Sequence, residues 1–533
     1  MNLKTVLLAC LFVITTAAPF NSDKRADVEA ASVEEATIAG KYINWNKIAK
    51  EIEATRKEWA IKGIAVGVVQ NGKVVFTKGF GVKNDANEPV DTKTLFQIGS
   101  TSKAFTAFAA AKVVDEGFMN WSTSVSSVYP VKFADEYTNA HANLIDLLSH
   151  RVGFGTMSDY TVYGLHKTSE TLLSKVQYLK QNVQFRQTWE YSNLMYTLAG
   201  ETAAKAAGVT WEQLIRTRIL EPLGMTSTLT NAHDMVPTKN HARGYFTDMD
   251  GINKQLKYED SYATDSCKPA GSIVTNVEDA AKWLTLMTKR GILANGTSLL
   301  SPEQFTPIVT PQFVTGQPFS SDVVSMDSYA LGWWIQSYRG KVKVEHSGGS
   351  PGYASQFDFY PNDDLAVFVI SNADGNPGVK TINNIVADRI LFPKVKYDWT
   401  KVNREANSQA LAYMEFINEQ LIAKRHLNTT TSVPFSSFEG TFTNLGFGNI
   451  TLQLTDKTKN LFDMKWTGDG KAQLTATVGH WEYDTLGVFE FPRFSYRNFS
   501  LPFQSLEFTK DAKQFSFVFP DFFHDVPAVF TRV

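Results

Sequence analysis

The sequence predicts an α/β (α+β) protein in which a sheet flanked by helices is followed by a separate all-β domain. Three observations carry this prediction. Runs with strand periodicity occur near residue 64 and again between 342 and 370, and the residues between them are mostly helical in pattern. The final stretch, 434–533, holds only short alternating runs, which are typical of an antiparallel β domain such as a small barrel.

The chain is expected to begin its folded part with a helix and a hairpin. Apolar and charged residues alternate at helical spacing over 43–59, and the β-rich runs 64–69 and 74–80 flank Asn71-Gly72. Asn-Gly between two such runs is a strong signal of a tight hairpin turn. A buried helix is then expected over 101–116, because its apolar residues recur at intervals of three and four.

The remaining elements follow from the same periodicities. Further helices are expected over 144–149, 172–179, 192–207 and 211–220, the last preceded by a capping box of Thr210 and Gln213. Consecutive strands are expected over 342–345, 356–360 and 365–370, completing the sheet begun near residue 64. A helix over 408–424 and the polar stretch 428–432 lead to the final strands, expected at 450–454, 461–466, 472–478, 505–508 and 515–519.

The overall composition and charge exclude several classes of protein. The 533 residues are 43% hydrophobic and 20% charged, which is ordinary for a globular protein and excludes disordered, collagenous and coiled-coil chains. Lys and Arg total 52 against 54 Asp and Glu, for a net charge of −2. No long-range field would steer such a chain onto nucleic acid or an anionic membrane, so neither partner is expected. The sequence carries no signal of oligomeric state.

The first residues resemble a secretory signal peptide. Lys4 is followed by the apolar run 6–14 and then by small residues, so we expect residues 1–17 to be removed after Ala17 and the protein to be secreted. The apolar run is about half the ~20 residues that a membrane-spanning helix needs, so no membrane span is expected. An N-terminal helix of a cytosolic protein is the alternative.

Since Cys10 lies in this segment, only Cys267 remains and no intramolecular disulfide can form in the mature chain.

Five Asn-x-Ser/Thr sequences are candidate glycan acceptors if the host is a eukaryote. They are Asn120, Asn295, Asn428, Asn449 and Asn498.

A serine and a lysine three residues apart begin the buried helix expected over 101–116. Ser100 and Lys103 would face the same way, one turn apart. A serine hydroxyl is a weak nucleophile until a base takes its proton, and a desolvated lysine can have its pKa depressed enough to act as that base. The spacing alone is weak, because a capped helix with a solvent-exposed lysine gives the same pattern.

Two further segments strengthen the catalytic interpretation. Tyr191-Ser192-Asn193 precedes an apolar helix, where a phenol could relay a proton and an amide could hold both the lysine and a substrate. Tyr137-Thr138-Asn139 has the same pattern but lies in a polar stretch, which disfavours it. His346-Ser347-Gly348-Gly349 ends an expected strand, where small residues such as Gly348 and Gly349 would let a substrate carbonyl approach backbone N–H groups.

Together these three motifs resemble those of the serine β-lactamase superfamily, in its class C, D-aminopeptidase, DD-peptidase and esterase branch. The resemblance spans roughly residues 45–390 and implies a β-lactamase/transpeptidase-like mixed sheet flanked by helices, with a helical subdomain and the active site in the groove between them. It implies that Ser100 is acylated, that Lys103 and Tyr191 are general bases and that Asn193 has a positioning role. His346 would lie beside the acyl group, and the backbone N–H groups of Ser100 and Gly349 would bind the oxyanion.

The same resemblance sets the expected domains and activity. We expect a signal peptide (1–17), a β-lactamase-related catalytic domain (45–393), a helix and linker (394–433) and a C-terminal all-β domain (434–533) that resembles the lipocalin-like domain of some family members. The expected activity is that of a secreted serine hydrolase acting on an ester, amide or peptide. Antibiotic-degrading enzymes usually have a permanently charged lysine where His346 stands, so efficient lactam hydrolysis is not expected. No cofactor is expected and, because the other histidines lack ligand spacing such as H-E-x-x-H, no metal.

Two other interpretations compete with this one. Residues 348–352 fit G-x-S-x-G, the nucleophile elbow of α/β-hydrolases, with Ser350 as nucleophile. That elbow needs a helix after the serine, whereas Pro351 and a strand-like run follow here. The second is a catalytically silent binding or scaffolding protein that keeps the fold, because fold does not guarantee function.

Overall fold

The structure is a computed structural model. It describes residues 36–38, 41–155, 165–247, 253–257, 265–315, 323–325, 327–394, 397–470, 473–490, 504–518 and 526–533. The expected signal peptide lies outside the described residues, as does the candidate glycan acceptor Asn498.

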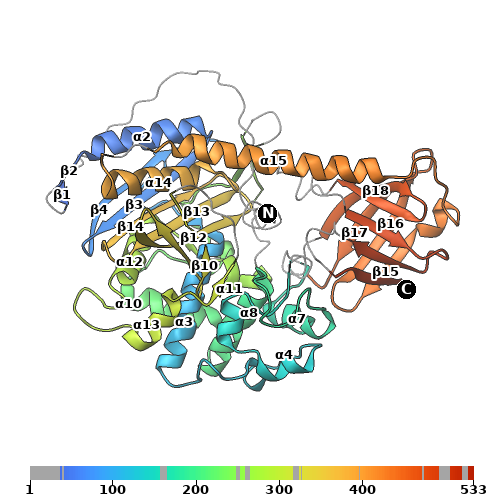
Figure 1. Ribbon diagram of the computed structural model, residues 1–533, viewed down its shortest axis with the longest axis horizontal. Coiled ribbons are helices and arrows are strands. Elements are labelled where there is room, and N and C mark those ends of the chain that lie inside the picture. Colours follow the sequence, from blue (N-terminus) through green and yellow to red (C-terminus); the bar gives the residue numbers. More distant parts are fainter. Residues whose placement is uncertain are drawn as a thin grey trace.

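An eight-stranded sheet forms the centre of the larger body (Figure 1), in the order β4-β3-β14-β13-β12-β11-β10-β9. Its strands are β3 (Gly63–Gln70), β4 (Lys73–Gly81), β9 (Phe313–Val314), β10 (Ser328–Tyr329), β11 (Trp334–Tyr338), β12 (Lys341–Ser350), β13 (Tyr353–Tyr360) and β14 (Leu365–Ser371). All residues of β3, β13 and β14 are buried, because helices cover both faces of the sheet.

The expected sheet flanked by helices is confirmed, but its strand directions differ from the mixed sheet that the resemblance implied. Each pairing in the sheet is antiparallel, including that of β14 with β3, which come from distant parts of the chain. Parallel neighbours require a long crossover connection, whereas β3–β4 and the run β11 to β14 are joined by short turns.

The first hairpin turn has the conformation that Asn-Gly favours. Asn71 has φ 53° and Gly72 has φ 72°, so both central residues adopt the left-handed region that a type I′ turn requires. The two strands therefore leave the turn with the twist of the sheet, and the expected hairpin is confirmed.

Helices pack on both faces of the sheet. On one face lie α2 (Trp45–Glu58) and α14 (Gly378–Leu391), and on the other α3 (Ser102–Asp115) and α12 (Val277–Thr288). The sequence interpretation missed α14, although Val379, Ile382, Val386 and Ile390 recur at helical spacing. Its β-branched residues weaken the local helical signal, and burial against the sheet compensates for them.

The remaining described helices lie mostly below the sheet in Figure 1. The helices are α4 (Glu136–His141), α5 (Leu144–Leu148), α7 (Ser169–Leu173), α8 (Asn193–Ala206), α9 (Trp211–Ile215), α10 (Glu221–Leu223), α11 (Lys268–Gly271) and α13 (Pro302–Val309). The strand pairs are β1 (Ala36–Ile38) with β2 (Lys41–Ile43), β5 (Phe96–Gln97) with β8 (Val274–Thr275), and β6 (Tyr245–Thr247) with β7 (Asn253–Gln255).

Two of the expected helices are not continuous α-helices. The helix expected over 172–179 is divided into α7 and a 3-10 turn at Val176–Tyr178. The helix expected over 211–220 begins with the predicted capping box of Thr210 and Gln213, but continues past α9 as a π-helical turn.

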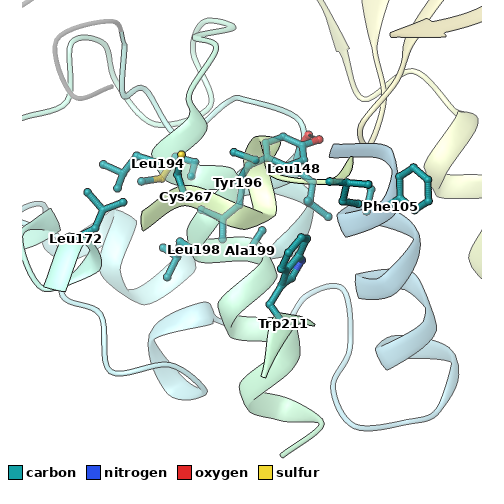
Figure 2. Close-up of a cluster of buried hydrophobic side chains, with 14 of the residues drawn as sticks. Phe105, Leu148, Leu172, Leu194, Tyr196, Leu198, Ala199, Trp211 and Cys267 are labelled. Carbon is teal, nitrogen blue, oxygen red and sulfur yellow. Dashed lines mark hydrogen bonds between the residues drawn. The ribbon is translucent and has the colours of Figure 1, made fainter. Parts of the chain in front are cut away.

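Helix α8 is the core of the helical subdomain. Figure 2 shows its Leu194 and Leu198 in the same buried cluster as Leu148 of α5, Trp211 of α9 and Phe105 of α3. Each of these side chains is at most 1% exposed. Burying such a side chain contributes roughly 1.5–3 kcal/mol, so this cluster fixes α3 and α8 against each other.

A long helix connects this body to the final domain. Helix α15 (Trp399–Lys424) begins well before the expected residue 408, because Asp398 caps its first turn and the buried Trp399 indole donates to Asp388 Oδ2 at 2.9 Å. None of the helices that the structure describes is long and apolar enough to cross a bilayer.

The final domain is a closed antiparallel barrel, as the sequence predicted. Its strands are β15 (Gly440–Asn444), β16 (Gly448–Asp456), β17 (Leu461–Thr467), β18 (Gln473–Glu482), β19 (Thr485–Glu490), β20 (Gln504–Phe508), β21 (Gln514–Val518) and β22 (Ala528–Arg532). Pairing of β15 with β22 closes it. Aromatic side chains fill the interior, where the rings of Phe515 and Phe530 stack 5.1 Å apart.

The barrel docks on the helical subdomain through the turn between β17 and β18. Asp469 accepts a hydrogen bond from the buried His166 Nδ1 at 2.7 Å, and the Gly470 N–H donates to the Leu165 carbonyl at 2.8 Å. At Gly468 a Cβ would lie 2.1 Å from that same carbonyl oxygen, so the approach requires glycine.

Replacing Asp469 with Ala is expected to weaken this docking. It leaves the buried His166 N–H without its partner, which costs about 1–3 kcal/mol, and should lower the midpoint of thermal unfolding. The matched control is Asp511→Ala, since that carboxylate bonds only within its own turn, to Thr509 and Lys513. Equal midpoints for the two variants, measured by calorimetry, would show that the His166–Asp469 contact adds no stability.

Candidate active site

Ser100 lies at the entrance of α3, in a 3-10 turn, η1 (Gly99–Thr101), that runs directly into the helix. Gly99 has φ 51°, and a Cβ there would come within 2.5 Å of the Gly349 carbonyl oxygen. The backbones of Gly99 and Gly349 are therefore in close contact, and the two expected oxyanion donors, the N–H groups of Ser100 and Gly349, belong to neighbouring segments.

Lys103 is fully buried one turn further along α3, beneath Ser100. Its Nζ is 3.2 Å from Ser100 Oγ, 2.7 Å from Asn193 Oδ1 and 2.9 Å from the Ala270 carbonyl oxygen. A buried ammonium must be compensated by hydrogen-bond acceptors, and these three oxygens come from three different helices. Nothing in the sequence pattern pointed to Ala270, because a backbone carbonyl carries no signature.

Tyr191 completes the group around Ser100. Its Oη donates to Ser100 Oγ at 2.9 Å, and its ring lies 4.8 Å from Lys103 Nζ. Ser192 caps α8 by accepting from the Met195 N–H, so Asn193 is the first residue of that helix. The expected convergence of Ser100, Lys103, Tyr191 and Asn193 is therefore present.

The third motif lies on β12, next to the serine. Residues 346–350 pair with β13, whereas β11 pairs with β12 only as far as Glu345 among the described strands. The edge of β12 beside Ser100 is thus left unpaired on one side. At Gly348 a Cβ would lie 1.9 Å from the Ile98 carbonyl oxygen, so glycine allows this strand to approach the turn that carries the serine.

His346 faces the same cleft as Ser100, but both of its ring nitrogens already have hydrogen-bond partners within the protein. Nε2 lies 2.9 Å from Tyr329 Oη, and Nδ1 lies 2.5 Å from the Ser347 carbonyl oxygen. Burial, and next the positive charge of Lys103, lower the pKa of His346 to about 4. The ring is therefore neutral at pH 7, donating from Nδ1 and accepting at Nε2, and adds no positive charge to the cleft.

The walls of the cleft include residues that the motifs did not indicate. Trp189 and Trp334 line it with ring centroids 5.0 Å apart, and Asp327 and Glu345 line it too. Burial raises the pKa of Asp327 to about 6, and the nearby Glu345 carboxylate acts in the same direction. These residues come from three separate segments, so only the tertiary structure brings them to the site.

The two competing motifs lie elsewhere or lack the required geometry. Ser350 ends β12, and a tight turn leads directly to β13, so no helix follows as a nucleophile elbow requires. Tyr137 is 59% exposed on α4 and stacks on His141, while the Asn139 side chain accepts from the Phe133 N–H. Gly348 and Gly349 line the cleft around Ser100, but Ser350 and the Tyr137 motif are not part of its lining.

The residues around Ser100 offer acceptors and donors for an acyl group rather than ligands for a metal. Within the part of the chain that the structure describes, no group of three or more His, Cys, Asp or Glu side chains could hold a metal ion.

The chain is similar to several known proteins. A family model described as Beta-lactamase matches residues 48–391. The chain is similar to an unguisins hydrolase of Aspergillus campestris, with 29% identity over 373 residues, covering 66% of this chain and 67% of that protein. It is also similar to an unguisins hydrolase of Aspergillus violaceofuscus, with 25% identity over 475 residues, covering 84% and 81%. A beta-lactamase of Pseudomonas fluorescens is 24% identical over 348 residues, covering 60% and 91%.

Two solved structures share the fold. An octameric penicillin-binding protein homologue from Pyrococcus abyssi covers 92% of this chain and 100% of its own, with TM-score 0.57 and 21% identity. A penicillin-binding protein from Bacillus halodurans covers 64% of this chain and 100% of its own, with TM-score 0.52 and 22% identity.

The buried histidine of the cleft predicts a loss of stability in acid. The folded-state pKa of His346 lies below the usual value of about 6.5. Between these two pKa values the imidazole is protonated in the unfolded chain but neutral in the folded chain. This penalty is absent above about pH 6.5 and grows as the pH falls towards 4, reaching about 2 kcal/mol at pH 5. His346→Gln should therefore lose less stability between pH 7 and pH 5 than the wild type, as measured by urea unfolding.

The control for this experiment is His233→Gln, at an exposed histidine. It should lose as much stability on acidification as the wild type. An equal loss in the His346→Gln variant would contradict the prediction.

Proposed function

The chain belongs to the beta-lactamase family, as its three motifs predicted, and from that premise we propose that it is a serine hydrolase that forms an acyl-enzyme at Ser100. One observation carries this proposal. Ser100 Oγ lies 3.2 Å from Lys103 Nζ and 2.9 Å from Tyr191 Oη, in a cleft beside the unpaired edge of β12. A hydroxyl with two proton-transfer groups in reach has the geometry of an activated nucleophile.

In the first half of the proposed reaction, Ser100 Oγ attacks the substrate carbonyl carbon while its proton passes to the phenol–amine pair. The carbonyl oxygen becomes an oxyanion held by the N–H groups of Ser100 and Gly349. Collapse of this intermediate forms the Ser100 ester and breaks the bond to the leaving group, which takes the proton. Water then attacks the ester, restoring Ser100 and releasing a carboxylic acid.

The contacts of Lys103 suggest which role in proton transfer falls to Lys103 and which to Tyr191. Three oxygens accept from its Nζ, which matches the three N–H donors of an ammonium. A charged Lys103 close to the phenol ring favours negative charge on the Tyr191 oxygen. Tyr191 would then take the serine proton, with Lys103 stabilising the phenolate and Asn193 holding the amine in place.

The chemistry of the cleft favours ester, amide or peptide substrates over β-lactam antibiotics. A lysine at position 346 would bind a carboxylate as a permanent cation, whereas the His346 ring is neutral and already engaged by Tyr329 and Ser347. Because two relatives are named as unguisins hydrolases, unguisins are the first compounds to assay, beside simple esters and D-aminoacyl amides.

We also propose that the protein is secreted and that residues 45–393 form the catalytic domain. Four candidate glycan acceptors, Asn120, Asn295, Asn428 and Asn449, have exposed side chains, as glycosylation requires.

Secretion is tested by expressing the full chain in a eukaryotic secretory host. The protein should reach the medium with Ala18 as its first residue, and removal of N-glycans should increase its gel mobility. Leu8→Asp, which interrupts the apolar run, should prevent export. Wild-type protein retained in the cells with Met1 in place would contradict the proposal.

Acyl-enzyme formation is tested with a fluorophosphonate probe. Labelling of wild-type protein should be lost in Ser100→Ala, because this hydroxyl lies within reach of both Lys103 Nζ and Tyr191 Oη, and retained in Ser350→Ala. Mass spectrometry should place the adduct on Ser100. Folded wild-type protein that takes no label and hydrolyses none of the assayed substrates would instead favour a binding or scaffolding role.

A further inference from the structure

We propose that His150 is a positioning residue that holds Tyr191 in reach of Ser100. This inference rests on the proposed function of Tyr191. The other histidines were expected to have only structural roles, and His150 lies outside the three motifs that define the site. It follows α5 and precedes a short segment that runs beside the residues leading to Tyr191.

Two hydrogen bonds from His150 hold the backbone on either side of Tyr191. The His150 carbonyl oxygen accepts from the Glu190 N–H at 2.8 Å, and its Nδ1 accepts from the Ser192 N–H at 3.0 Å. The residue before the phenol and the residue after it are therefore bound to the same histidine. With both neighbours held, the backbone of Tyr191 has little freedom to move its Oη away from Ser100.

The imidazole also packs against the phenol itself. Its ring centroid lies 4.4 Å from that of Tyr191 and 4.9 Å from those of Tyr196 and Tyr329. Burial lowers the pKa of His150 well below its usual value, and the charge of Lys103 adds to this effect. The ring thus stays neutral, which leaves the Nδ1 lone pair free to accept from Ser192.

The segment that carries His150 is itself anchored. Arg151 and Arg186 both bind the buried Asp146 carboxylate, at 2.6 and 2.8 Å. The Arg186 N–H donates to the Arg151 carbonyl at 2.7 Å, so the two segments are joined again before they reach the phenol. Because Asp146 and the two arginines hold this segment in place, His150 can hold Tyr191 in a fixed position.

Helix termination alone does not explain a histidine here. His150 has φ 60°, a left-handed conformation at a helix end, where glycine is usual and a residue with a side chain is strained. With Nδ1 accepting, Nε2 carries the hydrogen, and among the described residues this buried N–H has no partner. Two unfavourable features at one residue are typical of a site where function outweighs stability.

The test compares variants that differ in the acceptor at the Nδ1 position. His150→Gly suits the backbone but removes both acceptor and ring, so it should lower kcat on the order of 100-fold, the effect of a misplaced catalytic group. KM should change by much less, because the cleft walls remain. His150→Asn tolerates the same φ and places an amide oxygen near the Nδ1 position, so it should recover much of the loss. His150→Gln, one methylene longer, should not.

A second readout does not depend on activity. With 3-fluorotyrosine at position 191, the ¹⁹F signal should shift or broaden in His150→Gly and His150→Gln but stay close to wild type in His150→Asn. Thermal unfolding checks that each variant folds, and the Asn and Gln pair decides the question if the Gly variant does not. Unchanged kcat and an unchanged ¹⁹F signal in the folded Gly and Gln variants would overturn the proposal. If wild-type protein shows no Ser100-dependent reaction, the proposed function fails and the ¹⁹F comparison alone decides the role of His150.

Discussion

The burial of the Lys103 amine is the constraint on which the rest of the catalytic body depends. Its side chain is inaccessible to solvent, so the oxygens of Ser100, Asn193 and Ala270 must replace the lost water. A hydrogen bond to a charged group contributes about 1.5–3 kcal/mol, so each of these oxygens matters for stability. Helices α3, α8 and α11 are therefore tied together at one point, and that point is the candidate active site.

The sheet completes this arrangement from the other side. Gly348 and Gly99 allow β12 and the serine turn to meet at backbone distance, closer than any side chain would permit. The short reach of β11 leaves the edge of β12 open beside Ser100 among the described strands. Backbone contact and an open edge together give a cleft whose donors are main-chain groups, positioned by the fold rather than by flexible side chains.

The final domain contributes to the same body through a few specific contacts. Its interior is a packed aromatic core, and its β17–β18 turn contacts the helical subdomain near His166. Helix α15 bridges the separation between the two bodies (Figure 1). The barrel thus adds a second anchor to the helical subdomain that carries Tyr191 and Asn193.

The sequence by itself determined the fold class, the first hairpin, the buried helix behind Ser100 and the three motifs, because each depends on residues that are close along the chain. Periodicity reports which face of an element is buried, and Asn71-Gly72 reports a local turn. The sequence could not show that β14 pairs with β3, that β11 ends at the cleft, or that the ring of His346 is hydrogen-bonded to Tyr329. Nor could it show that His150 holds the backbone around Tyr191. Only the tertiary structure decided these points, because each depends on how whole elements pack against one another and not on the local sequence pattern.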